Sequence, residues 1–249
     1  MVVHTEAAAP RKRADKKQPV KAEGATKARL TTAKPAPESR DGNGRGSRDL
    51  WLDAARDLLL QQGVASVMIL PLSKQLNLSR TSFYWFFTDR EELLQELLVR
   101  WRDRNTGAIV RQAEGYAESI VEATLNLFDC WLDSGLFDTK FEFAVRSWAL
   151  QSEAVAAEIK TADRDRIEAI AAMFMRYGYS AKDADVRART VYLAQIGYIS
   201  MQTVEDPQVR MPRIAHYVEV FTGKRPEQRE IDRFFGRHRF TPTPADAPT

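Results

Sequence analysis

The spacing of apolar residues constrains the fold of this chain more than any other feature of its sequence. Between Leu50 and Leu59, apolar side chains recur at positions i, i+3, i+4 and i+7, which places them on one face of a helix. Gly63 follows at the point where a glycine commonly ends a helix. The pattern predicts a first helix over residues 47–62. Similar patterns continue to about residue 235, so we expect an all-α protein.

A second, shorter apolar run and the residues after it predict a helix-turn-helix. The run extends over residues 69–76, and Pro71 lies near its start, where a missing N–H does no harm. Asn77 tolerates the left-handed conformation of a tight turn, and Ser79 can cap the next helix. We therefore expect three short helices up to residue 87, with the helix-turn-helix at about 68–87. The second helix of such a motif lies in the major groove of DNA.

The segment LNLSRTSFYWFF, residues 76–87, is polar at its start. Arg80, Thr81 and Ser82 can form hydrogen bonds to base edges or to phosphates. The free N–H groups at the start of a helix also attract phosphate, and Ser79 lies at that position. These four residues are the first candidates for contact with DNA.

The same segment is aromatic at its end. Aromatic residues at helical spacing are more often core than contact residues, so we expect Phe83, Phe86 and Phe87 to pack inward. The hydroxyl of Tyr84 needs a polar partner, which favours contact with a phosphate. For Trp85 the sequence leaves contact with DNA and a plain surface position equally open.

Two S/T-x-x-E patterns predict the starts of longer helices. The first extends from Thr88 to Glu91 and precedes a leucine-rich run, so a long amphipathic helix should continue to about Arg111. The second extends from Thr139 to Glu142. Each Thr is the expected N-cap of its helix.

The excess positive charge of the chain lies in its N-terminal segment. Residues 1–46 contain 11 Lys and Arg against 5 Asp and Glu, a net charge of +6, whereas the remainder has 26 against 29, a net charge of −3. The segment is rich in Ala, Pro, Lys and Thr, so it cannot bury enough apolar surface to offset its ordering entropy. We expect a disordered tail, which either tracks DNA phosphates or only keeps the chain in solution.

Several classes of protein find no support in the sequence. No apolar run approaches the roughly 20 residues of a membrane span. We expect no secretory signal, because no apolar run follows the basic residues near the N-terminus. A single cysteine points to the cytoplasm. Cys130 is expected to be a buried small hydrophobe, with redox sensing as the alternative. The histidines show no ligand spacing, and no nucleotide-binding or nucleophile motif is present, so we expect no enzyme, no metal and no cofactor.

The helix-turn-helix region resembles the tetracycline-repressor (TetR) family of bacterial transcriptional regulators. The resemblance covers some fifty residues with every spacing kept, and it rests on Ala54-Ala55, Gly63, Leu72-Ser73, Asn77-Leu78-Ser79, Ser82-Phe83-Tyr84, Phe87, Arg90-Glu91 and Leu93. Four residues depart from the family pattern: Met68, Ser73, Asn77 and Phe86. The resemblance implies that Tyr84 contacts a backbone phosphate and that Arg90 does so from the start of the fourth helix. It also implies C-terminal helices that bind an effector and pair two subunits.

Further helices are expected at about 115–134, 139–160, 161–177, 181–204 and 208–222. The last two combine small residues with large flat ones, which lets two helices approach closely. By resemblance they would form a four-helix bundle with a second copy, and the alternative is that both stripes serve only the core of the subunit. The candidate interface residues are Tyr192, Gln195, Tyr198, Met201, Ile214, Tyr217, Val218 and Phe221.

A sensor also needs a cavity. We expect large side chains on the C-terminal helices to surround one, with Arg146 as the charge that fixes an anionic effector. Each aromatic among them is alternatively plain core. The candidate pocket residues are Phe128, Trp131, Phe141, Arg146, Trp148, Phe174 and Tyr192.

The sequence thus predicts an all-α regulator, most simply a repressor. It would bind a pseudo-palindromic DNA operator as a homodimer and be released by a small-molecule effector. The alternative is a helical enzyme or protein-interaction module that keeps the scaffold without sequence-specific DNA binding. The expected domains are a tail (1–46), a three-helix DNA-binding domain (47–106), a helical effector-binding and dimerisation domain (107–235) and a flexible C-terminal tail (236–249).

Overall fold

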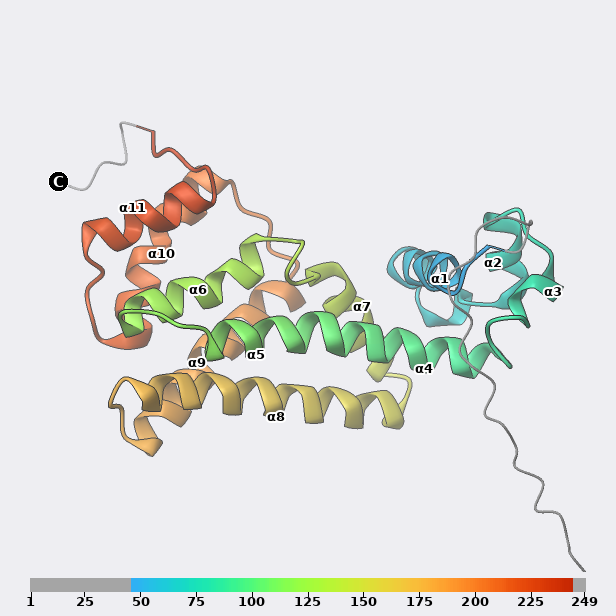
Figure 1. The fold of residues 1–249 in the computed structure, drawn as a ribbon, viewed down its shortest axis with the longest axis horizontal. Helices are drawn as coiled ribbons and strands as arrows, with labels where there is room; N and C mark the ends of the chain where they lie inside the picture. Colours follow the sequence, from blue (N-terminus) through green and yellow to red (C-terminus); the bar gives the residue numbers. More distant parts are fainter. Residues whose placement is uncertain (1–45, 244–249) are drawn as a thin grey trace, which may run out of the picture. The chain divides into compact units, whose positions relative to one another are not determined.

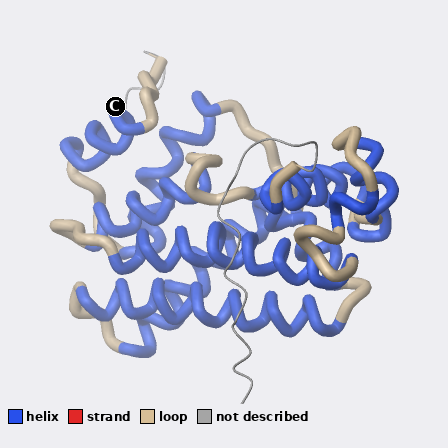
Figure 2. Tube along the Cα trace, turned by 45° about the vertical axis from the view of Figure 1, so that its right-hand side comes forward, coloured by secondary structure: helices blue, strands red, loops and turns tan. Residues whose placement is uncertain are grey.

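A computed structural model describes residues 46–243. These residues form helices and connecting loops, and no strand occurs among them (Figure 2), which confirms the all-α fold. The predicted N-terminal tail lies outside the described residues except for Gly46, as do residues 244–249. The elements are α1 (Arg48–Gln62), η1 (Val64–Ser66), α2 (Ile69–Gln75), α3 (Arg80–Phe83), α4 (Arg90–Trp101), η2 (Arg102–Thr106), α5 (Gly107–Glu114), α6 (Ile120–Leu132), α7 (Thr139–Ala149), α8 (Glu153–Arg176), α9 (Ala181–Ser200), α10 (Pro207–Thr222) and α11 (Gln228–Arg237).

Helices α1 to α4 pack around one apolar cluster, which we call the N-terminal core (Figure 1). Trp51 of α1 is fully buried and meets Phe83 edge to face, with ring centroids 5.4 Å apart. Phe87 stacks on Phe83 at 5.2 Å. The first helix of the region is therefore fixed directly to the segment that follows the turn.

The turn between α2 and α3 has the predicted geometry. Asn77 adopts a left-handed conformation with φ of 52°. Ser79 is the N-cap of α3, and its hydroxyl accepts a hydrogen bond from the backbone N–H of Ser82 at 3.2 Å. Ser47 caps α1 in the same way. The predicted first helix and the roles of Asn77 and Ser79 are confirmed.

The two predicted capping boxes are wrong by one residue. The N-cap of α4 is Asp89, which accepts from the N–H of Glu92, while Thr88 donates to the Glu92 carboxylate from outside the helix. The N-cap of α7 is Asp138. In each case an Asp precedes the first helical residue, and its carboxylate is an equally good acceptor for the free N–H groups.

Helix α4 continues through the π-helical turn η2 into α5, so the helical rod extends to Glu114, beyond the expected end at Arg111. The π turn brings the side chains of Asn105 and Thr106 into the interior. There the Asn105 amide donates to the carbonyl of Asp138 at 3.1 Å, and its oxygen accepts from the N–H of the same residue at 2.9 Å. The expected domain boundary at 106/107 therefore falls inside one continuous rod.

The C-terminal helices differ from expectation mainly where polar caps interrupt the apolar pattern. Ser152 starts a new helix, so the expected helices 139–160 and 161–177 are replaced by α7 and the long α8. The expected helix at 115–134 begins only after its cap Ser119. Helix α9 ends at Ser200, before the expected 204.

Helix α11 was not expected. It buries Ile231 and Phe234 and includes Gly236 and Arg237, so the predicted flexible tail does not begin at residue 236. Beyond α11, the imidazole of His238 lies 2.8 Å from the Asp129 carboxylate.

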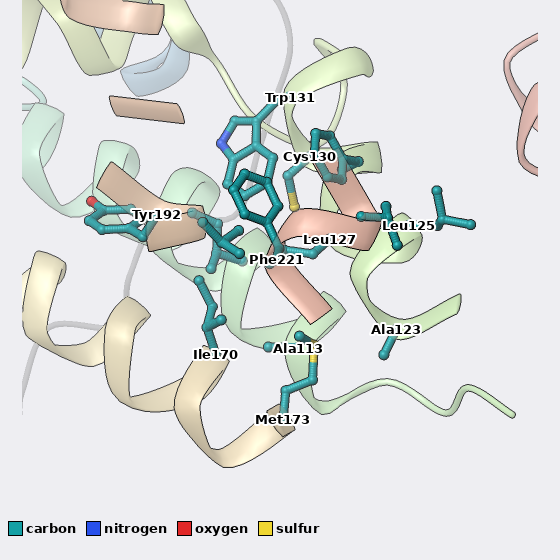
Figure 3. Close-up of a cluster of buried hydrophobic side chains, with 14 of the residues drawn as sticks. Ala113, Ala123, Leu125, Leu127, Cys130, Trp131, Ile170, Met173, Tyr192 and Phe221 are labelled. Atoms are coloured by element: carbon teal, nitrogen blue, oxygen red, sulfur yellow. The ribbon is translucent and has the colours of Figure 1, made fainter. Parts of the chain in front are cut away.

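The C-terminal helices form a second apolar cluster, the C-terminal core. Figure 3 shows side chains meeting there, among them Ala113 of α5, Ile170 of α8, Tyr192 of α9 and Phe221 of α10. Helix α7 and the first half of α8 belong instead to the N-terminal core, to which they contribute Phe141, Val145, Trp148, Val155 and Ile159. The N-terminal core and the C-terminal core therefore both include residues of α8, and they are not separated by a loop. None of the described helices is long and apolar enough to span a membrane.

Candidate nucleic-acid interface and pocket

The first candidate site is the turn of α3, where four predicted contact residues lie outward. Arg80 and Thr81 are exposed at its start. Tyr84 is 58% exposed and Trp85 61% exposed. The exposure of Trp85 fits both alternatives that the sequence left open, contact with DNA and a plain surface position. These side chains form one outward group on α3 and the two residues that follow it, which we call the reading turn.

Ser82 does not belong to the reading turn. It is only 5% exposed, and its hydroxyl lies 2.9 Å from the hydroxyl of Ser79. Because it precedes Phe83 on the inward side of α3, its polar group serves the cap of the helix rather than a ligand. The prediction that Ser82 faces DNA is wrong for this structure, and Ser79 acts first as the cap.

The aromatic residues behind the reading turn fix its position. Phe83 and Phe87 are buried and Phe86 is half-buried against the N-terminal core, as expected. Arg48 of α1 braces them from the other side. Its guanidinium lies over the Phe87 ring at 4.6 Å and donates to the Phe86 carbonyl.

The same guanidinium joins α1 to α4. Arg48 donates to Glu96, with Nε 2.7 Å from Oε2, and pairs with Glu92 at 3.1 Å. The hydrogen bond with Glu96 raises the pKa of Arg48 above its ordinary value. Arg48 thus ties the segment behind the reading turn to both α1 and α4.

Arg90 has a different role from the one the resemblance implied. Its Nε donates to the carbonyl of Val67 at 2.6 Å and its Nη2 to the carbonyl of Val64 at 2.9 Å. Its remaining nitrogen pairs with Glu91 at 2.8 Å. Because these donors are occupied, Arg90 holds the loop around η1 in place instead of reaching outward to a phosphate.

A buried charged network lies where the two cores meet. Glu142 of α7 and Arg166 of α8 are both fully buried and paired at 2.7 Å. The indole of Trp101 donates to Glu142 at 2.7 Å and the amide of Asn105 at 2.9 Å. Arg166 also donates to the Thr106 hydroxyl at 2.9 Å. Each of the two charged groups therefore has partners on helical segments other than its own.

The network keeps both partners ionised. Burial alone would raise the pKa of Glu142, but the charges of Arg166 and Arg146 and the hydrogen bonds from Arg166 and Asn105 together hold the pKa below the ordinary value. Burial works against the charge of Arg166 as well, and Glu142 outweighs that effect, so the pKa of Arg166 is raised. The network therefore joins helices rather than exchanging protons.

Arg146 belongs to this network and not to a cavity. It pairs with Asp163, with the closest atoms 2.5 Å apart, and with Glu142 at 2.9 Å. It also donates to the Tyr192 hydroxyl at 2.9 Å. Two carboxylates already neutralise its charge, so the prediction that Arg146 fixes an anionic effector is not supported.

A cavity of about 600 Å³ lies between the C-terminal end of α1 and helices α6, α7, α9 and α10. Of the seven predicted pocket residues, Trp131 and Trp148 line it. Phe128, Phe174 and Tyr192 are buried in the C-terminal core, and Phe141 is buried in the N-terminal core. The sequence pattern identified large buried side chains, but it could not distinguish a position in the cavity wall from one in an apolar core.

The predicted interface residues fall into two groups, those that are buried and those that are at least partly exposed. Five of them are buried in the subunit itself: Tyr192, Gln195, Ile214, Val218 and Phe221. Tyr198 and Tyr217 are half-buried, with their hydroxyls 2.9 Å apart, and Met201 is exposed. For those five, the alternative that the stripes serve the core of the subunit is the correct one.

Other candidate chemistry is weak in the described part of the chain. No cluster of three or more His, Cys, Asp or Glu there could hold a metal ion. Burial raises the pKa of the Cys130 thiol to about 12. Such a thiol forms almost no thiolate near neutral pH, which does not favour redox sensing.

Comparisons with known proteins agree with this geometry. Residues 52–97, which contain the helix-turn-helix, match the family described as bacterial regulatory proteins, tetR family. No curated protein gives a significant match. Among solved structures, AmtR from Mycobacterium smegmatis has a TM-score of 0.52 and 17% identity, with 82% of this chain and 99% of that chain covered. This likeness supports the fold.

Two further solved structures are similar. A TetR-family transcriptional regulator from Mesorhizobium loti, described as putative in its name, has a TM-score of 0.49 and 12% identity, with 76% of this chain and 95% of that chain covered. The TetR family repressor AlkX from Dietzia sp. has a TM-score of 0.42 and 21% identity, with 73% and 96% covered.

The match over the helix-turn-helix, the all-helical fold and the outward reading turn lead to one identification. Residues 52–97 form a DNA-binding domain of the tetR family of bacterial regulatory proteins, which supports a DNA-binding regulator.

Proposed function

We propose that this regulator acts in the cytoplasm as a homodimeric repressor that binds a pseudo-palindromic operator and is released by a small-molecule effector. The observation that carries the proposal is the reading turn, on which Arg80, Thr81, Tyr84 and Trp85 lie outward from a buried aromatic support. A cationic donor at the start of α3 and a phenol at its C-cap suit base edges and phosphates. Two such turns on a symmetric dimer would suit two half-sites.

The dimer surface that we propose differs from the sequence prediction. Val186 and Leu193 are exposed on α9, and with Thr190 and Gly197 they follow the i, i+4, i+7, i+11 spacing of one helical face. A Cβ added at Gly197 would meet no atom within 4 Å. Helix α10 carries a second face of this spacing, with exposed Val209 and Val220 at its ends. A small residue beside exposed apolar ones favours close approach of a second copy.

The dimer is tested by sedimentation of Leu193→Glu. A charge on the proposed face should give a monomer and weaken operator binding, because the two half-sites are then bound independently. Leu150→Glu is the matched control, since Leu150 is exposed just after α7, away from this face. If Leu193→Glu remains a dimer while the control also does, the α9 face is not the interface.

DNA binding is tested by fluorescence anisotropy with the promoter DNA beside the gene, at two or more salt concentrations. Arg80→Ala should weaken binding about tenfold or more and reduce the salt slope by about one if Arg80 contacts a phosphate. Tyr84→Phe removes only the hydroxyl and tests the second contact. Arg164→Ala, an exposed arginine of α8, is the control.

The alternative of a helical protein without sequence-specific DNA binding gives different results. It predicts no preference for the promoter over unrelated DNA and no difference between Arg80→Ala and Arg164→Ala. Reporter expression with and without the regulator distinguishes repression from activation.

A further inference from the structure

We propose that the cavity beside α1 binds an aromatic monocarboxylate, and that this compound is the effector. The inference rests on the proposed function, since it names the ligand class of a ligand-released regulator. The cavity of about 600 Å³ lies within the size range of small-molecule sites. The residues below define its chemistry.

The cavity wall contains polar groups that lack partners. The indole Nε1 of Trp131 is buried without a hydrogen-bond partner, and the residue is only 6% exposed. Gln195 is 3% exposed, lines the same cavity, and its side-chain amide forms no hydrogen bond with another described residue. An unmade hydrogen bond at a buried donor is unfavourable. A ligand acceptor would satisfy the indole donor where a small shift of the wall uncovers Nε1, which is buried in this structure.

The charges of the wall favour a negative acceptor. Lys140 and Arg210 are the charged residues among those that line the cavity, and no carboxylate lies with them. The Arg210 guanidinium lies over the Tyr198 ring at 5.3 Å and forms no ion pair with a described residue. An arginine held by a ring but without a carboxylate partner is suited to a carboxylate from a ligand.

The rest of the wall favours a flat apolar body. Four aromatic side chains line the cavity: Trp131, Phe143, Trp148 and Tyr198. Aromatic faces at a pocket wall bind rings by offset stacking or edge contacts. A purely aliphatic ligand would leave the Trp131 donor unsatisfied, and a cationic ligand would be repelled by Arg210.

The cavity also touches both halves of the region. Leu59, Leu60, Gly63 and Val64, at the end of α1 and the start of η1, form part of its wall opposite the residues of α7. An occupant would therefore contact the helix that supports the reading turn and the helices of the C-terminal half together. Binding there can favour one arrangement of α1 against α7 over another.

The charge preference is tested by calorimetry with three related probes: 1-naphthylacetate, 1-naphthylacetamide and 1-naphthylmethylamine. They share the ring and differ in charge. The acetate should bind about tenfold more tightly than the amide, and the amine should bind most weakly, because a hydrogen bond to a charged group is worth about a factor of ten.

Two variants separate the two contacts. Arg210→Gln should remove the advantage of the acetate over the amide. Trp131→Phe should weaken both about fivefold and keep their ratio, because it removes a donor and not a charge. Arg189→Gln is the matched control, since Arg189 pairs with Asp185 on the exposed side of α9. Far-UV circular dichroism checks that each variant is folded.

The indole contact has a direct readout. The chain has five tryptophans, so the ¹⁵N-labelled protein gives five indole N–H signals. The signal absent from Trp131→Phe should be the one that moves most when 1-naphthylacetate is added.

The proposal is overturned if the acetate does not bind at millimolar concentration, if it binds no better than the amine, or if the Trp131 signal does not move. Operator binding without any probe is measured separately. A protein that binds the operator but fails these ligand tests keeps the proposed function and loses only this ligand class.

Discussion

Arg80 on the reading turn and Arg166 in the buried network show how one residue type serves two purposes. Arg80 is exposed at the start of α3. Arg166 is fully buried, pairs with Glu142 and donates to Thr106 and Tyr192. A partner supplied by the protein makes an arginine structural, whereas an exposed arginine at a helix start is available to an external anion. Three predictions test this difference and a fourth tests the turn before Arg80, from the largest effect to the smallest.

The largest effect is expected for Arg166→Met. The variant leaves Glu142 buried without its main partner, and breaking a buried pair in this way costs about 3–5 kcal/mol. Urea unfolding measures the loss. The double variant Arg166→Met with Glu142→Gln should be more stable than the single variant, because the stranded charge is gone. If the double variant is less stable than the single one, the stranded charge is not the cause.

Acid should weaken the same network. The pKa of Glu142 is held below its ordinary value of 4.5, so its ionised form stabilises the fold above that value, and the contribution is lost as the pH falls through the lower, folded pKa. The stability difference between the wild type and the double variant should therefore shrink as the pH falls from 6 towards 3. A constant difference would contradict the direction given for Glu142.

Arg90→Ala should lower the free energy of unfolding rather than remove a contact with DNA. It removes two hydrogen bonds from a charged donor to the carbonyls of Val64 and Val67, which predicts a loss of about 2 kcal/mol. Arg80→Ala should change stability by less than about 0.5 kcal/mol. At a temperature where both variants are folded, only Arg80→Ala should reduce the salt slope. A reduced slope in Arg90→Ala would restore the phosphate contact that the resemblance implied.

The smallest effect concerns the turn. Asn77 has a left-handed backbone, which alanine adopts at a cost of about 1 kcal/mol. Asn77→Ala should lower the free energy of unfolding by about that amount, whereas Asn77→Gly should be nearly neutral. Equal losses in the two variants would indicate that the Asn77 side chain matters instead.

The local features that depend on neighbouring residues could be predicted from the sequence. Asn77, Ser79 and the inward Phe83 and Phe87 follow from turn chemistry and helical spacing, and each is where it was expected. The predicted N-cap residues were wrong by one position, because Asp89 and Asp138 compete with the neighbouring threonines for the same N–H groups.

Features set by distant partners could not be predicted. Arg90 faces carbonyls more than twenty residues earlier in the chain, and Arg146 faces Asp163 across two helices. Periodicity also cannot tell the wall of a cavity from a core, which is why Phe128 and Trp131 were predicted together although only Trp131 lines the cavity. Two spacings in the sequence hinted at the network: four residues between Glu142 and Arg146, and three between Asp163 and Arg166.

Asp138 connects three elements through one residue. Its carboxylate caps α7 by accepting from Phe141 at 3.0 Å and also accepts from Arg56 of α1 at 3.0 Å. Its backbone is held by Asn105 in the π turn. Since one carboxylate serves both the helix terminus, through Oδ1, and the ion pair with Arg56, through Oδ2, a shift of α1 against α7 would pull on the residue that caps α7. Amide exchange at Phe141, whose N–H this cap holds, would therefore test whether a movement of α1 loosens the start of α7.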